Sequence, residues 1–179
     1  MNPSPSNLLV AVANEVGFVK VIGRANVALS VHFKILLAKL QGNGFRNFVL
    51  DLGECATMDS TFLGVLVGAV LHSAGTPPEG SATCLQLLNP NQRVAELLEN
   101  LGVAHLFAML RGANPAEAAL EPSAPTHVPA SKEEITRTCL EAHQLLMAVN
   151  PENVPKFKDV AQFLAEDLKK LKEEAGGSG

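Results

Sequence analysis

The chain has 179 residues, of which 47% are hydrophobic and 18% are charged, and its net charge is −4. This length accommodates one ordinary domain and an appendage, with enough apolar material for a packed core. The sequence contains no Trp or Tyr and has no clustered basic face, which argues against a protein that binds nucleic acid through base stacking or phosphate contacts.

Three cysteines, Cys55, Cys84 and Cys139, are odd in number and far apart, so no disulfide framework or metal-binding spacing is indicated and a reducing cytoplasm is expected. The first residues lack the features of a secretion signal, and no apolar run approaches the roughly 20 residues needed to cross a bilayer. The five histidines show no metal-ligand spacing, and no phosphate-binding glycine motif occurs. We therefore expect no membrane, metal, cofactor or enzymatic activity.

The N-terminal pattern predicts two strands followed by a helix. Residues 8–13 and 18–22 are β-compatible runs separated by the turn-forming residues 14–17, so an antiparallel hairpin is expected. A helical period then begins after Gly23, and the glycines of 42–44 end it. Its expected apolar stripe consists of Val27, Val31, Ile35 and Ala38, widened by Leu36, Leu37 and Leu40.

The segment 48–71 is the most informative part of the chain. Residues 48–52 predict a buried strand, and Met58-Asp59-Ser60-Thr61 then opens an almost wholly apolar helix over 62–71. Two hydroxyls therefore lie at a helix N-terminus, where unpaired N–H groups favour an anion such as phosphate. From the residues alone, a simple N-cap role for Asp59 or Ser60 is favoured over modification.

The remaining pattern predicts more sheet and helix, then a change of composition. Residues 84–88 predict a strand, 93–101 an amphipathic helix, and 106–110 a final strand, and such alternation indicates a layered α/β sheet. We assign residues 7–111 to one domain and the Pro- and Ala-rich residues 112–130 to a linker.

Residues 131–174 predict a helical hairpin. Ser131 and Glu134 form a capping box at its start, and Asn150-Pro151 separates its two helices. Each apolar stripe needs a cover, which the other helix, the first domain, a second copy of the chain or another protein can supply. The first stripe is Ile135, Cys139, Ala142, Leu146 and Val149, and the second is Phe157, Val160, Leu164, Leu168 and Leu171. His143 lies among packing residues and has no supporting motif for a phosphate relay.

The ordered string Leu50-Asp51-Leu52, a short loop, and then residues 58–66 resembles the signature of the STAS domain, the anti-sigma factor antagonist fold. The resemblance covers about 105 residues. It implies an α/β fold with a mixed sheet and helices packed on it, to which the C-terminal helical hairpin is added. It also implies a bacterial, cytoplasmic, non-enzymatic regulator of transcription that acts by partner switching.

The resemblance assigns roles to the residues at the helix start. Ser60 corresponds to the hydroxyl that a partner serine kinase, the anti-sigma factor, phosphorylates, and Thr61 is the second candidate. A phosphatase would reverse the modification. Partner contacts are expected from Asn26, Asp59, Ser60, Thr61 and Phe62.

Two positions depart from the family pattern. Phe62 stands where the motif usually has Gly, and a core-filling role is favoured for it; Asn26 stands where an acidic residue is common. The alternative function is a scaffolding STAS subunit without a phosphate switch. It would assemble through the domain and the C-terminal helices, for example as a homodimer.

Overall fold

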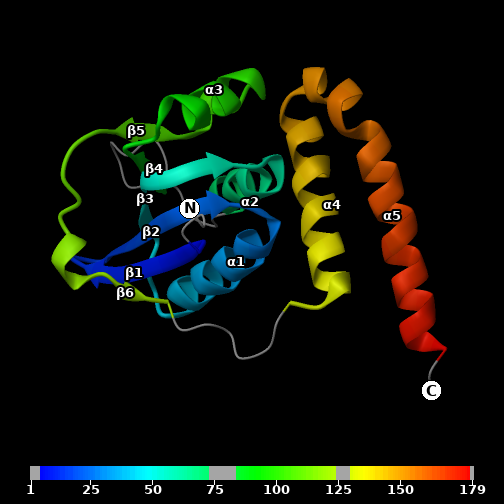
Figure 1. Ribbon diagram of the computed structural model, residues 1–179, viewed down its shortest axis with the longest axis horizontal. Helices are drawn as coiled ribbons and strands as arrows, with labels where there is room; N and C mark the ends of the chain where they lie inside the picture. Colours follow the sequence, from blue (N-terminus) through cyan, green and yellow to red (C-terminus); the bar gives the residue numbers. More distant parts are fainter. Residues whose placement is uncertain (1–4, 73–83, 124–129, 178–179) are drawn as a thin grey trace.

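The structure, a computed structural model, describes residues 5–72, 84–123 and 130–177 (Figure 1). Within these residues, the strands form one six-stranded mixed sheet in the order β5-β4-β3-β2-β1-β6. The strands are β1 (Asn7–Ala13), β2 (Val16–Ala25), β3 (Asn47–Met58), β4 (Leu85–Leu88), β5 (Ala108–Leu110) and β6 (Glu121–Pro122). The α-helices are α1 (Val27–Gly42), α2 (Ser60–Leu71), α3 (Gln92–Asn100), α4 (Lys132–Val149) and α5 (Val154–Gly176). Short 3-10 turns cover Ala104–Leu106, Glu117–Ala119 and Pro151–Asn153.

The β1–β2 hairpin confirms the turn expected at residues 14–17. β1 pairs antiparallel with β2, and Asn14 and Glu15 between them both have positive φ angles, as a tight two-residue hairpin turn requires. From β2 through β3 and β4 to β5 the pairing is parallel. These parallel strands are linked through helices, as the alternation in the sequence predicted.

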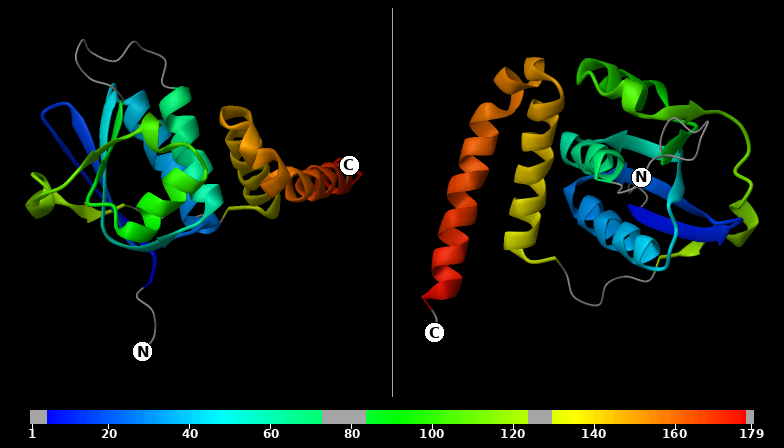
Figure 2. Two further views of the ribbon diagram at one scale, coloured as in Figure 1. Left: turned by 90° about the horizontal axis from the view of Figure 1, so that it is seen from above. Right: turned by 180° about the vertical axis from the view of Figure 1, so that it is seen from behind.

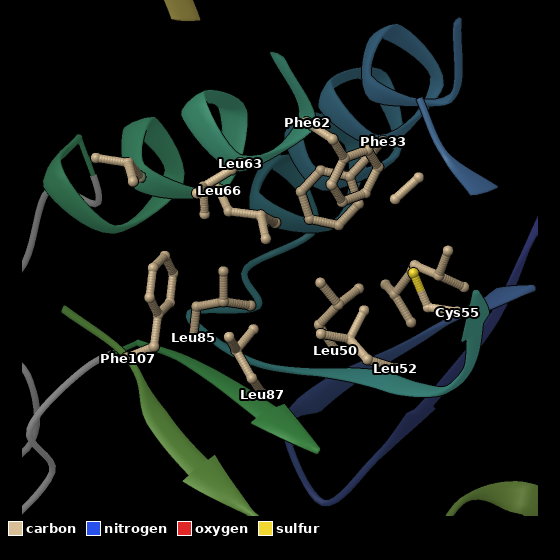
Figure 3. Packing of buried hydrophobic residues seen from close by; sticks show 14 of the residues in the cluster. Phe33, Leu50, Leu52, Cys55, Phe62, Leu63, Leu66, Leu85, Leu87 and Phe107 are labelled. Carbon is tan, nitrogen blue, oxygen red and sulfur yellow. The ribbon is translucent and has the colours of Figure 1, made fainter. Parts of the chain in front are cut away.

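The main core lies between one face of the sheet and helices α1, α2 and α3, and Figure 3 shows the part of it under α1 and α2. Side chains at alternate positions of β3, such as Leu50 and Leu52, point into it and meet Leu63 and Leu66 of α2. The Phe62 ring packs against Phe33 of α1, with ring centroids 5.4 Å apart. The strong apolarity of α2 is therefore explained by its burial against the sheet.

The apolar stripe predicted for α1 is partly wrong. Ile35 is 41% exposed and Ala38 is also exposed, whereas Phe33 is buried. A long apolar run carries more than one candidate stripe, and contact with α2 and the sheet decides which one turns inward.

Part of the segment predicted as a linker belongs to the sheet. β6 pairs antiparallel with β1, and Ala116 packs with Phe18 and Val49 on the sheet face opposite the helices. Lys20 on the same face forms salt bridges of 2.6 Å with Glu54 and Glu117, and these carboxylates raise its pKa. Residues 124–129 of the predicted linker lie outside the described residues.

The predicted C-terminal hairpin is present. α4 begins with the capping box of Ser131 and Glu134 and lies between the α1/α2 layer and α5 (Figures 1 and 2). On its outer side it packs on α5 through a cluster of Leu140, Met147, Ala161, Leu164 and Leu168. In α5, Val160 is 39% exposed although the pattern placed it inward, because Ala161 takes the contact with α4 instead. The first domain and α5 therefore cover opposite sides of α4.

Candidate functional site

The site lies where the N-termini of α1 and α2 meet. Ala25 of β2 pairs with Met58 of β3, and the next residue on each strand is the N-cap of a helix: Asn26 for α1 and Asp59 for α2. The Asp59 amide donates to the Ala25 carbonyl at 3.0 Å, which ties the two helix starts together. Parallel pairing of β2 and β3 thus brings residues 26 and 59 into one place.

Asp59 is the N-cap residue of α2, which agrees with the simple N-cap role that the sequence favoured for Asp59 or Ser60. Its Oδ1 accepts from the Phe62 amide at 2.8 Å. Burial raises the pKa of the Asp59 carboxyl, while hydrogen bonds from the backbone amides of Phe62, Val27 and Thr61 oppose that shift. Asn26 caps α1 in the same way, through Oδ1 and the Leu29 amide at 3.0 Å. Both side chains therefore accept hydrogen bonds that fix the starts of the two helices.

Ser60 is the first residue of α2 and is half-buried. Its Oγ lies 2.9 Å from Nε2 of His143 on α4, and the two atoms share a hydrogen bond. Burial lowers the pKa of the His143 imidazole, with the neighbouring Asp59 carboxylate acting in the opposite direction. The candidate phosphoacceptor therefore contacts the hairpin directly.

Thr61 is 4% exposed, which places the second phosphoacceptor candidate out of reach of a kinase in this conformation. Its Oγ1 lies 3.2 Å from Sγ of Cys139, and that sulfur lies 3.7 Å from Nδ1 of His143. Cys139 and His143 are four residues apart, so they lie on one face of α4 and meet the two hydroxyls of α2 together.

The expectation that Phe62 contacts a partner is corrected. Its side chain is 0% exposed and belongs to the core, which bears out the core-filling interpretation. A residue at the third position of α2 faces the sheet, where a ring fills the space between α1 and β3. The structure thus brings together Asn26, Asp59, Ser60 and Thr61 and excludes Phe62.

His143 belongs to this site, although the sequence pattern placed it only among packing residues. It is 5% exposed, touches Ser60 on one side and stacks on Phe157 of α5 on the other, with ring centroids 4.9 Å apart. One signal was present in the sequence: a titratable ring four residues after Cys139 in a helix otherwise expected to present apolar residues. That pattern marks a polar contact within a buried face.

The described residues hold neither a metal-ligand cluster nor a membrane-spanning helix. No group of three or more His, Cys, Asp or Glu side chains there is placed to hold a metal ion. No described helix is both long enough and apolar enough to span a bilayer.

Comparison with solved structures identifies the fold. An anti-sigma factor antagonist from Mycobacterium paratuberculosis aligns with a TM-score of 0.53 and 16% identity, over 66% of this chain and 96% of that one. The anti-sigma factor antagonist SpoIIAA in its unphosphorylated form aligns with a TM-score of 0.47, over 62% of this chain and 90% of that one. SpoIIAA in its phosphorylated form, described as a Bacillus cell fate determinant, aligns with a TM-score of 0.45, over 62% of this chain and 94% of that one. Both SpoIIAA alignments have 19% identity.

The chain therefore contains the STAS fold predicted from residues 50–66. The α/β class, the mixed sheet and the C-terminal helices are likewise as predicted. About a third of this chain has no counterpart in the Mycobacterium structure, since that alignment takes in 66% of it. The sequence itself matches no family model and no curated protein.

Proposed function

We propose that the chain is a protein-binding regulator of the anti-sigma factor antagonist kind, controlled by phosphorylation of Ser60 by a partner serine kinase. The observation that carries the proposal is the place of the Ser60 hydroxyl. It stands at the start of α2, outside the apolar core, while Thr61 and Phe62 beside it are buried. The fold adds support, because the Mycobacterium protein with the same fold is described as an anti-sigma factor antagonist.

Phosphate at this position would change the surface strongly. It adds roughly 1.5 to 2 negative charges and three acceptor oxygens. The Thr61 and Phe62 amides at the start of α2 already bond to the Asp59 carboxylate, so this carboxylate repels the phosphate and drives it outward toward a bound partner. A partner that contacts Asn26, Asp59 and Ser60 would be released, and a phosphatase would restore binding.

Affinity purification from cells of the source organism tests this function. Phosphopeptide mass spectrometry should find phosphate on Ser60. A serine kinase should co-purify with the wild-type chain and with Ser60→Ala, and its recovery should fall at least tenfold with Ser60→Asp. Ser131→Asp is the matched control, because Ser131 also lies at a helix N-terminus and Asp is an equally good N-cap. Equal recovery of the kinase with all four chains would contradict the proposal.

The second candidate is a scaffolding STAS subunit without a phosphate switch, assembling as a homodimer or with another protein through the domain and α5. It is favoured by the hydrogen bond between Ser60 and His143, which gives the hydroxyl a structural partner. It is also favoured by Phe163 of α5, whose side chain is 69% exposed. This candidate predicts an unmodified Ser60 and an assembly that falls from a dimer to a monomer in solution when residues 131–174 are removed.

A further inference from the structure

The hairpin packs against two glycines of α2, Gly64 and Gly68. A Cβ atom added to Gly64 would lie 2.5 Å from Cβ of Ala142 and 2.7 Å from its backbone, so the absence of a side chain is what lets α4 approach. One turn further along, Gly68 faces the side chain of Leu145. The spacing of four places both glycines on the side of α2 that α4 covers.

This close approach puts α4 over the hydroxyl of Ser60. The separation of 2.9 Å between Ser60 Oγ and His143 Nε2 is a hydrogen-bond distance and leaves no space for a phosphorus atom and its three oxygens. Thr61 and Cys139 are in contact beside this pair, at 3.2 Å. A phosphate on Ser60 in this side-chain position would therefore collide with α4.

Leu146 of α4 is wholly buried in the main core, but another part of the contact is incompletely packed. A groove of about 610 Å³ lies between α1, α2 and α4, bordered by Leu37, Val65, Ala69 and Leu145. Across it, Lys34 reaches Glu141 at 3.5 Å, and both side chains are substantially exposed, so this salt bridge contributes little. Permanent interiors are packed as densely as organic crystals. An open groove under α4 therefore indicates that this part of the contact holds α4 less firmly than a fully packed interior would.

We propose that the α4–α5 hairpin covers the protein-binding face, which is the surface around Asn26, Asp59 and Ser60. We further propose that the hairpin cannot stay docked on this face while Ser60 carries phosphate. The proposal deepens the proposed function and rests on it for the role of Ser60. The partner that competes with the hairpin is a protein surface that contacts the start of α2, in the place where Cys139, Ala142 and His143 now lie. The chain thus presents its recognition face only when the hairpin leaves it.

The decisive experiment needs no kinase. Phosphoserine is incorporated at position 60 during translation, and amide hydrogen exchange is compared with that of the wild-type chain. We expect exchange in α4 to rise at least tenfold while β3 keeps its protection. Phosphoserine at position 6 is the control, because the Ser6 hydroxyl bonds to the Arg24 amide at the first domain and not to the hairpin. Unchanged protection of α4 would overturn the proposal, and so would a loss of protection that includes β3.

A second experiment holds the hairpin closed. Thr61→Cys places a thiol beside Sγ of Cys139, so that oxidation can join α2 to α4. We expect the oxidised chain to lose the kinase recovered in the affinity purification and the reduced chain to regain it. Adding Cys139→Ser must abolish the effect of oxidation. Binding that is the same in both redox states would overturn the proposal.

The search for phosphate on Ser60 in cells and the exchange measurement with phosphoserine at position 60 test the proposed function and the docking proposal separately. If Ser60 is never phosphorylated in cells, the proposed function fails, but phosphoserine placed at position 60 still tests whether the modification and the docked hairpin exclude each other.

Discussion

Gly64→Ala should detach the hairpin while leaving the first domain folded. The new Cβ would lie 2.5 Å from Cβ of Ala142 and 2.7 Å from both its Cα and its carbonyl oxygen. Backbone atoms cannot rotate out of the way, so α4 must move. Overpacking of this kind costs about 1–3 kcal/mol, which corresponds to a shift of roughly 5- to 150-fold toward the open form. Within α2 itself, Ala is favoured over Gly by about 1 kcal/mol, so the domain should not weaken.

Amide hydrogen exchange measures the shift, with α4 as the reporter and β3 as the reference. Gly68→Ala is the matched control on the same face of α2. Its Cβ would lie 3.3 Å from Cδ2 of Leu145, the end of a flexible side chain that can rotate, so exchange in α4 should stay near the wild-type rate. If Gly64→Ala protects α4 as well as the wild-type chain does, the close approach of the two helices is not what holds the hairpin in place.

Three further predictions concern the core, the hairpin turn and pH. Phe62→Ala should lower the free energy of unfolding by about 3–5 kcal/mol, since the ring is wholly buried; a cost under 1 kcal/mol in urea denaturation would place it outside the core. Asn153→Ala should weaken hairpin docking by about 1–3 kcal/mol, because Nδ2 donates to the Leu101 carbonyl at 2.9 Å; α4 exchange that matches wild type would refute this. Because burial lowers the pKa of His143 below 6.5, the docked form binds fewer protons than the open form, and docking should weaken as the pH falls below about 6.5. Asp59, whose pKa burial raises, contributes with the opposite sign, so the test is whether His143→Gln removes this acid-induced rise in α4 exchange.

The elements and the fold of the first domain were largely predictable because their signals are local. Hydrophobic period distinguishes strands from helices, and short polar residues mark helix starts, as the capping box at Ser131 shows. Asp59 was predictable as a cap for the same reason, since its partner is only three residues away. Long apolar runs were less informative, as the exposed Ile35 shows, because several stripes compete until tertiary contacts choose one.

What covers the site depends on contacts between distant parts of the chain. Ser60 and His143 are 83 positions apart, and each lies in a helix whose apolar stripe would suit several different neighbours. The fit that selects α4 depends on the missing side chain at Gly64 meeting Ala142, a matter of shape between two surfaces. The local pattern was enough to predict the helices, the caps at Asp59 and Ser131, and the position of the hydroxyl at the start of α2. The placement of the helices relative to one another depends on packing. Apolar burial stabilises contact with any surface that fits well, so the hydrophobic period of a helix does not identify the element that covers it.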